Sequence, residues 1–164
     1  MEGLWNTVPF GMTMLGQARI SDIAERIKTP CADISMGVSA ERAVDIRMHF
    51  SRVKSAGPED LVLRFEHVIA LHWNDEMFGS VFVARPPLPR ITNASEPRFM
   101  NWTYPILEID GSPWVEQCLQ VRPQMKPPLK HFLLVAMNDL VDVLAQPPTK
   151  VAWVSVVGEH ALKV

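Results

Sequence analysis

The segment LVLRFEHVIALHWND, residues 61–75, contains two histidines with acidic neighbours, and these residue types bind metals and transfer protons. His67 and His72 are five residues apart. In a strand this spacing places them on opposite faces, and in a helix it rotates them about 140° away from overlap. Only a β-bulge would bring both imidazoles to one face. We therefore expect no metal site here, and nothing else in the chain predicts a cofactor.

The same segment alternates as one half-buried strand does. The apolar face that carries Leu63 and Phe65 also carries His67, whereas His72 lies on the mixed face. This pattern predicts a buried, hydrogen-bonded His67 and an exposed His72. Because an imidazole in an apolar setting can exchange protons near neutral pH, His67 is the first candidate catalytic residue.

Two other segments supply candidates for acid–base chemistry. His131 lies in the apolar run KHFLLVAM, and Glu108 and Asp110 end the segment YPILEID. If two of the histidines converge with Asp110 or Glu108 in the fold, an imidazole and a carboxylate could transfer protons together. His131 and Asp110 are therefore the second and third candidates.

Sequence motifs typical of enzymes with an activated nucleophile or a phosphate-binding loop are missing. There is no G-x-S-x-G elbow, and neither cysteine has the neighbours of an activated thiolate. The stretch GMTMLGQ has the glycine spacing of a P-loop but lacks its lysine and its serine or threonine. These absences favour a non-enzymatic interaction protein. The alternative is a small ligand-binding protein or enzyme with a histidine–carboxylate pocket.

Composition limits the class of protein and of partner. The chain has 164 residues, 48% of them hydrophobic, which predicts a single domain over residues 1–164. Sixteen basic and eighteen acidic residues, without runs of like charge, give no surface for nucleic acid or an anionic membrane. Cys31 and Cys118 are isolated, so we expect neither a disulfide framework nor a zinc site. With no signal-peptide or membrane-span pattern, we expect a cytoplasmic protein.

Strand patterns dominate the first two thirds of the chain. ADISMGV and VDIRMHF alternate apolar with polar or small residues and predict a hairpin through residues 39–42. SVFVARP predicts a short strand that ends at its prolines. After YPILEID, Ser112 can cap a helix and Pro113 suits its first position, so a short helix should run from Trp114 to about Gln120.

The last third predicts a strand–helix–strand unit. KHFLLVAM is apolar on both faces, as an inner strand is, and KVAWVSVV predicts a further strand. Between them, Asn138 can cap a helix formed by DLVDVLA. The whole pattern predicts an α+β, β-rich fold, mainly an antiparallel sheet or sandwich with a few short helices.

Three segments together resemble a loose group of small bacterial proteins of unassigned function. These segments are FEHVIALHWNDE, YPILEIDGSPWVEQC and KHFLLVAMNDLVDVLAQPPTKVAWV. The resemblance covers roughly the C-terminal two thirds of the chain and brings no known active site with it. It implies a cytoplasmic bacterial protein.

The segment KVAWVSVV predicts self-association. Both of its faces are apolar and only Ser155 is polar after the lysine. Unless such a strand is central in its sheet, it leaves an edge or face that must be covered, and a second copy would cover it as a two-fold dimer. The alternative is a strand inserted between two others of one chain. In either case we expect Trp153 in the core, with Trp153→Ala costing about 3–5 kcal/mol.

Overall fold

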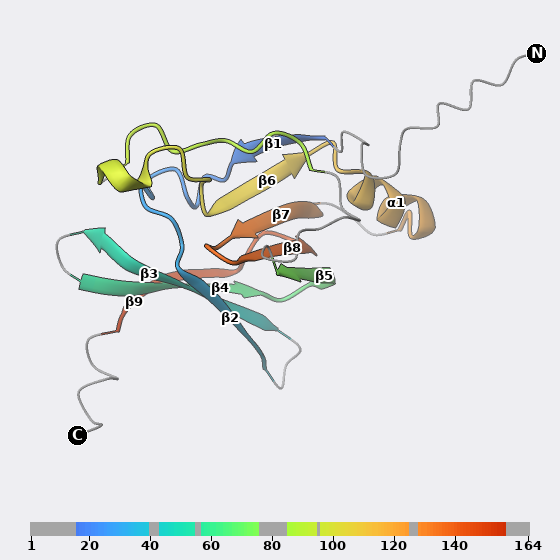
Figure 1. The fold of residues 1–164 in the computed structure, drawn as a ribbon. Helices are drawn as coiled ribbons and strands as arrows, with labels where there is room; N and C mark the ends of the chain where they lie inside the picture. Colours follow the sequence, from blue (N-terminus) through green and yellow to red (C-terminus); the bar gives the residue numbers. More distant parts are fainter. Residues whose placement is uncertain are drawn as a thin grey trace, which may run out of the picture.

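Two antiparallel sheets form the protein in a computed structural model that describes residues 16–39, 43–54, 57–75, 85–94, 96–124 and 128–156 (Figure 1). The five-stranded sheet has the order β1 (Gln17–Ile20), β6 (Ile106–Asp110), β7 (Lys130–Val135), β8 (Asp139–Ala145), β5 (Val68–Asp75). The four-stranded sheet has the order β2 (Asp33–Val38), β3 (Val44–Lys54), β4 (Gly57–Phe65), β9 (Lys150–Ser155). A short 3-10 helix, η2 (Pro97–Phe99), and one α-helix, α1 (Pro113–Val121), complete the described elements. This architecture confirms the predicted β-rich α+β fold.

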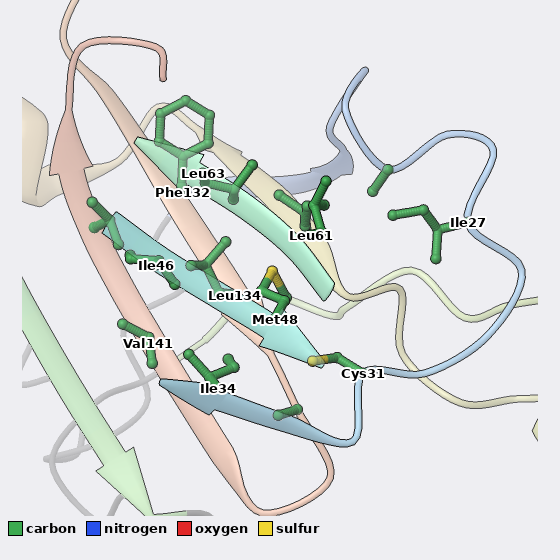
Figure 2. Close-up of a cluster of buried hydrophobic side chains, with 14 of the residues drawn as sticks. Ile27, Cys31, Ile34, Ile46, Met48, Leu61, Leu63, Phe132, Leu134 and Val141 are labelled. Atoms are coloured by element: carbon green, nitrogen blue, oxygen red, sulfur yellow. The ribbon is translucent and has the colours of Figure 1, made fainter. Parts of the chain in front are cut away.

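The main core lies between the two sheets. Alternate residues of β3 and β4, such as Met48 and Leu63, point from the four-stranded sheet toward Phe132 and Leu134 of β7 and Val141 of β8. Figure 2 shows these side chains meeting between the strands. All five are fully or almost fully buried. The period of two in the sequence thus sets the inner face of the four-stranded sheet.

The five-stranded sheet is buried on its other face as well. There Leu133 of β7 and Leu140 of β8 pack against Ile91 and Tyr104 from the connection between β5 and β6. Burial on both faces explains why the consecutive residues FLLV of β7 are all apolar, and it confirms the predicted inner strand. None of the helices among the described residues has the length and apolarity needed to span a bilayer.

The predicted C-terminal strand–helix–strand unit is wrong, because DLVDVLA forms the strand β8. It pairs antiparallel with β7, and the hairpin is closed by a hydrogen bond of 2.8 Å from the Ala136 N–H to the Asp139 carbonyl. Asn138 therefore lies in a turn and caps no helix. Because both faces of β8 are buried, aliphatic residues occupy neighbouring positions, and the sequence does not show the alternation typical of a strand. The valines of β8 favour an extended backbone.

The segment 61–75 is also not one strand. β4 ends at Phe65 in the four-stranded sheet and β5 begins at Val68 in the five-stranded sheet, so Glu66 and His67 form the corner between them. His67 is exposed there, which makes the prediction of a buried His67 wrong. The predicted exposure of His72 is confirmed, with 46% of its side chain exposed.

Several local predictions are confirmed by the structure. β2 and β3 form the predicted hairpin, with Val38 opposite Val44. Ser112 is the N-cap residue of α1, and Pro113 is its first residue. KVAWVSVV supplies β9, while most of the predicted strand SVFVARP lies outside the described residues.

The two cysteines should differ sharply in reactivity. Cys31 is buried in the main core with its Sγ 3.1 Å from the Asp33 carbonyl oxygen, and burial raises the pKa of its thiol to about 12. Cys118 is partly exposed, and neither cysteine is in a disulfide. Iodoacetamide at mildly alkaline pH should therefore modify Cys118 and spare Cys31, as read by peptide mass spectrometry. In denaturant both thiols should react, and equal modification of the folded protein would contradict the burial of Cys31.

Candidate functional site

A buried aspartate lies between two histidines on the face of the five-stranded sheet that points away from the four-stranded sheet. Asp142 of β8 is fully buried, and His72 of β5 is its direct cross-strand neighbour. The His131 Nε2 atom on β7 lies 2.8 Å from the Asp142 Oδ1 atom, and the His72 Nδ1 atom lies 3.6 Å from Oδ2. Arg85 donates two hydrogen bonds of 2.7 Å to the two carboxylate oxygens.

The charge of this cluster is set by Asp142. Burial by itself raises the pKa of Asp142, but the hydrogen bonds from Arg85 and His131 and the positive charge of Arg85 outweigh burial and hold that pKa below its usual value. The carboxylate is therefore ionised and accepts a hydrogen bond from the His131 Nε2–H group. In the imidazole tautomer with its hydrogen on Nε2, the Nδ1 atom can accept a hydrogen bond.

Ser112, at the start of α1, is the hydrogen-bond partner of the His131 Nδ1 atom. The Ser112 Oγ atom lies 2.7 Å from Nδ1, and the serine is 3% exposed. Although Ser112 occupies the N-cap position, its side chain makes no capping hydrogen bond. Sequence reasoning predicted its position correctly, whereas the partner of its hydroxyl group follows only from the packing of α1 on β7.

The first turn of α1 also covers the two imidazoles. The Trp114 ring stacks on His131 with a centroid distance of 5.1 Å and an interplanar angle of 11°. The same ring meets His72 edge to face at 6.1 Å. Trp114 therefore holds the plane of the His131 ring and limits the access of solvent from that side.

Two cavities adjoin the cluster. The larger, about 500 Å³, is mainly apolar and lies between α1 and the strands β5 and β8; it is lined by Ile69, Ala70, Trp114, Gln117, Cys118, Val121, Arg122 and Leu144. The smaller, about 170 Å³, is more polar; it is lined by Glu108, Ile109, Asp110, Gly111, Ser112, Val115, Glu116, Leu129, Lys130 and His131. The serine and the histidine of the cluster thus form part of the wall of the smaller cavity.

The three sequence-predicted site residues are in different places. His131 lies in the cluster, but its carboxylate partner is Asp142 and not Asp110. Asp110 is exposed at the end of β6, lines the smaller cavity and pairs with Arg19, whose Nε atom is 2.9 Å from its carboxylate. His67 lies at the corner between β4 and β5. Glu108 is buried and is bound by Arg19 and by the Lys130 Nζ atom, the latter at 2.9 Å.

Asp142 is the site residue that sequence reasoning missed. The signal was the acidic residue in the middle of the run DLVDVLA, because a carboxylate buried among leucines and valines needs a cationic partner. Among the residues that the structure describes, no group of three or more His, Cys, Asp or Glu side chains is placed to hold a metal ion.

A second candidate site is the free edge of β9. Among the described residues, the only strand that pairs with β9 is β4, so β9 ends the four-stranded sheet. Val151, Trp153 and Val154 are 46%, 42% and 42% exposed. The prediction that Trp153 belongs to the core is therefore wrong, although its ring lies 5.4 Å from that of Phe50. Trp153 has a neighbouring strand on one side only among the described residues.

Comparison of the chain with protein-family models, with curated proteins and with solved structures finds no match.

Proposed function

We propose that the protein is a self-associating interaction protein that forms a homodimer through the free edge of β9. The observation that carries the proposal is an edge strand whose two faces both expose apolar side chains, Trp153 on the inner face and Val154 on the outer. Exposed apolar edges of this kind pair with another chain unless something covers them.

The backbone of β9 supplies the hydrogen-bonding groups for this pairing. The Val156 N–H group donates to the Pro58 carbonyl at 3.3 Å, in the same register that places Val154 opposite Asp60. Even-numbered residues of β9 therefore direct their backbone groups toward β4. Because consecutive residues of a strand direct these groups to opposite sides, Val151, Trp153 and Ser155 direct theirs outward.

One antiparallel register is self-complementary. A two-fold axis at Trp153 places it opposite Trp153 of the second copy and places Val151 opposite Ser155, so the outward groups pair in every case. On the outer face Lys150 comes opposite Val156, which brings no like charges together. This register joins the two four-stranded sheets into one sheet and buries both Trp153 rings.

The charge pattern of the four-stranded sheet supports a protein partner over nucleic acid. On its outer face the Arg47 Nη1 atom lies 2.9 Å from the Asp60 carboxylate, and the Arg64 Nε atom lies 2.9 Å from the Asp45 carboxylate. Basic groups paired in this way give no positive field for phosphates. Free thiols at Cys31 and Cys118 and the resemblance to small bacterial proteins support a bacterial cytoplasmic location as part of the proposal.

Light scattering after size exclusion tests the dimer. At micromolar concentration the wild-type protein should have twice the 18.5 kDa mass of one chain. Trp153→Lys should give a monomer, because the register sets two lysines directly opposite each other. Met36→Lys is the matched control: Met36 is 41% exposed on β2, the other edge of the same sheet, and its replacement should leave the dimer intact.

Two outcomes would overturn this proposal. One is a wild-type mass near that of a single chain that does not change on concentration. The other is a dimer that Met36→Lys dissociates and Trp153→Lys does not, which would move the interface to β2. Far-UV circular dichroism of each variant checks that the sheets have formed.

A further inference from the structure

A continuous chain of hydrogen bonds joins a serine, a histidine and an aspartate in this protein. Ser112 Oγ lies 2.7 Å from His131 Nδ1, and His131 Nε2 lies 2.8 Å from Asp142 Oδ1. This is the connectivity that activates serine nucleophiles, with the two ring nitrogens exchanged. The exchange preserves the chemistry, since either nitrogen can take a proton while the other one donates.

We infer that Ser112 is a nucleophile that takes up a short acyl group from an uncharged ester in the smaller cavity, with His131 as its general base. This activity goes beyond self-association and uses none of the residues of the β9 edge. The residues that support Ser112 have matching roles. Asp142 fixes the tautomer of His131, and Arg85 fixes the carboxylate through its two hydrogen bonds.

The orientation of Ser112 is not explained by the helix that it begins. An N-cap serine whose side chain bonds to the first turn stabilises the helix that it begins. Ser112 makes no such bond and directs its hydroxyl group to the imidazole. Asp142 is also bound by Arg85, which neutralises part of its negative charge. The carboxylate therefore stabilises a protonated His131 less than a carboxylate without an arginine partner would. We therefore expect slow acyl transfer.

The smaller cavity limits the substrate by size and charge. Its volume of about 170 Å³ is that of about five or six water molecules at roughly 30 Å³ each, which fits an acyl group of a few carbon atoms. Its wall carries the three carboxyl groups of Glu108, Asp110 and Glu116 and the one ammonium group of Lys130. This balance favours an uncharged ester over one that carries a carboxylate.

The reaction needs only an ester and water. The Ser112 oxygen bonds to the carbonyl carbon while its proton moves to His131 Nδ1, and the ester C–O bond breaks as the alcohol leaves with that proton. Water then hydrolyses the acyl-serine to the acid and restores the hydroxyl group. The Val115 N–H group, in the first turn of α1 on the cavity wall, has no acceptor within the helix and would bind the oxyanion.

Methanesulfonyl fluoride, a small reagent for nucleophilic serines, tests the inference on the full chain. The serine O–S bond forms, the S–F bond breaks, His131 takes the proton and fluoride leaves. Intact mass and peptide mapping should show one methanesulfonyl group per chain, at Ser112. Ser35, exposed on β2 without a histidine partner among the described contacts, is the internal control and should remain unmodified.

Two variants separate a nucleophile from a structural serine. Ser112→Ala should lose the modification, and His131→Gln should slow it about 100-fold or more, because the amide cannot take the proton. Trp153→Lys should be modified at the wild-type rate, whether or not the protein forms a dimer. Wild-type protein that is unmodified at Ser112, or modified equally fast at Ser35, would overturn the inference even if a variant fails to fold. A fully reactive His131→Gln variant would do the same.

Discussion

Asp142→Ala should lower the free energy of unfolding by about 3–5 kcal/mol, as breaking a buried ion pair does. The carboxylate is fully buried and accepts two hydrogen bonds from Arg85 and one from His131. Alanine leaves the guanidinium charge in place with 13% of the Arg85 side chain exposed and no anion beside it. The buried Arg85 Nε atom already lacks a hydrogen-bond partner among the described residues. Urea unfolding followed by circular dichroism measures the loss.

Asp45→Ala is the matched control for this effect. Asp45 also binds an arginine through both carboxylate oxygens, with Arg64 at 2.9 and 3.0 Å, but its side chain is 38% exposed. A solvent-exposed pair contributes about 0–1 kcal/mol, so this variant should remain close to the wild type. Equal losses at the two positions would show that burial does not set the strength of the Asp142 cluster.

The pH dependence of the Asp142 effect follows from its pKa. Arg85 and His131 hold that pKa below the usual value despite burial, so the folded state binds a proton at this group less readily than the unfolded state. The stabilisation is therefore complete above the unfolded pKa of about 3.9 and is lost as the pH falls through the folded value. The difference between wild type and Asp142→Ala should therefore shrink below about pH 4.

Sequence patterns predicted the four-stranded sheet better than the five-stranded one, and the reason is burial. In β3, Ile46 and Met48 face the core while Arg47 faces solvent, so apolar and polar residues alternate in the sequence with the period of a strand. In β8, Val141 and Leu140 are buried on opposite faces. A short aliphatic run of this kind fits a buried helix or an inner strand equally well, and only the pairing with β7 decides between them.

The candidate site could be predicted only in part, because its contacts join residues that are far apart in the sequence. His131 was a candidate because an imidazole in an apolar run needs a partner, and this inference from its surroundings gave the correct residue. Its partner could not be predicted, because Asp142 reaches it only when β7 and β8 form a hairpin. The prediction of a buried His67 was wrong for a related reason. The alternation of apolar and polar residues continues through the corner at which the chain passes from one sheet to the other.

Phe132→Ala should cost about 3–5 kcal/mol of unfolding free energy, whereas Trp153→Ala should cost only about 1–2 kcal/mol in dilute protein. Phe132 is 1% exposed in the main core and packs at 5.5 Å from the Phe65 ring. Trp153 keeps 42% of its surface exposed at the edge of β9, so its removal opens little cavity within one chain. Chemical denaturation at nanomolar concentration, read by circular dichroism or a fluorescent label, measures both costs.

The same two variants connect stability to self-association. A dimer is stabilised by mass action, so its unfolding midpoint rises with protein concentration. If β9 pairs with β9 of a second copy, the cost of Trp153→Ala should grow as the concentration rises, because the wild type then gains an interface that the variant lacks. The cost of Phe132→Ala arises within each chain and should change much less. A Trp153→Ala cost as large as that of Phe132→Ala at every concentration would instead place Trp153 in the core of a single chain.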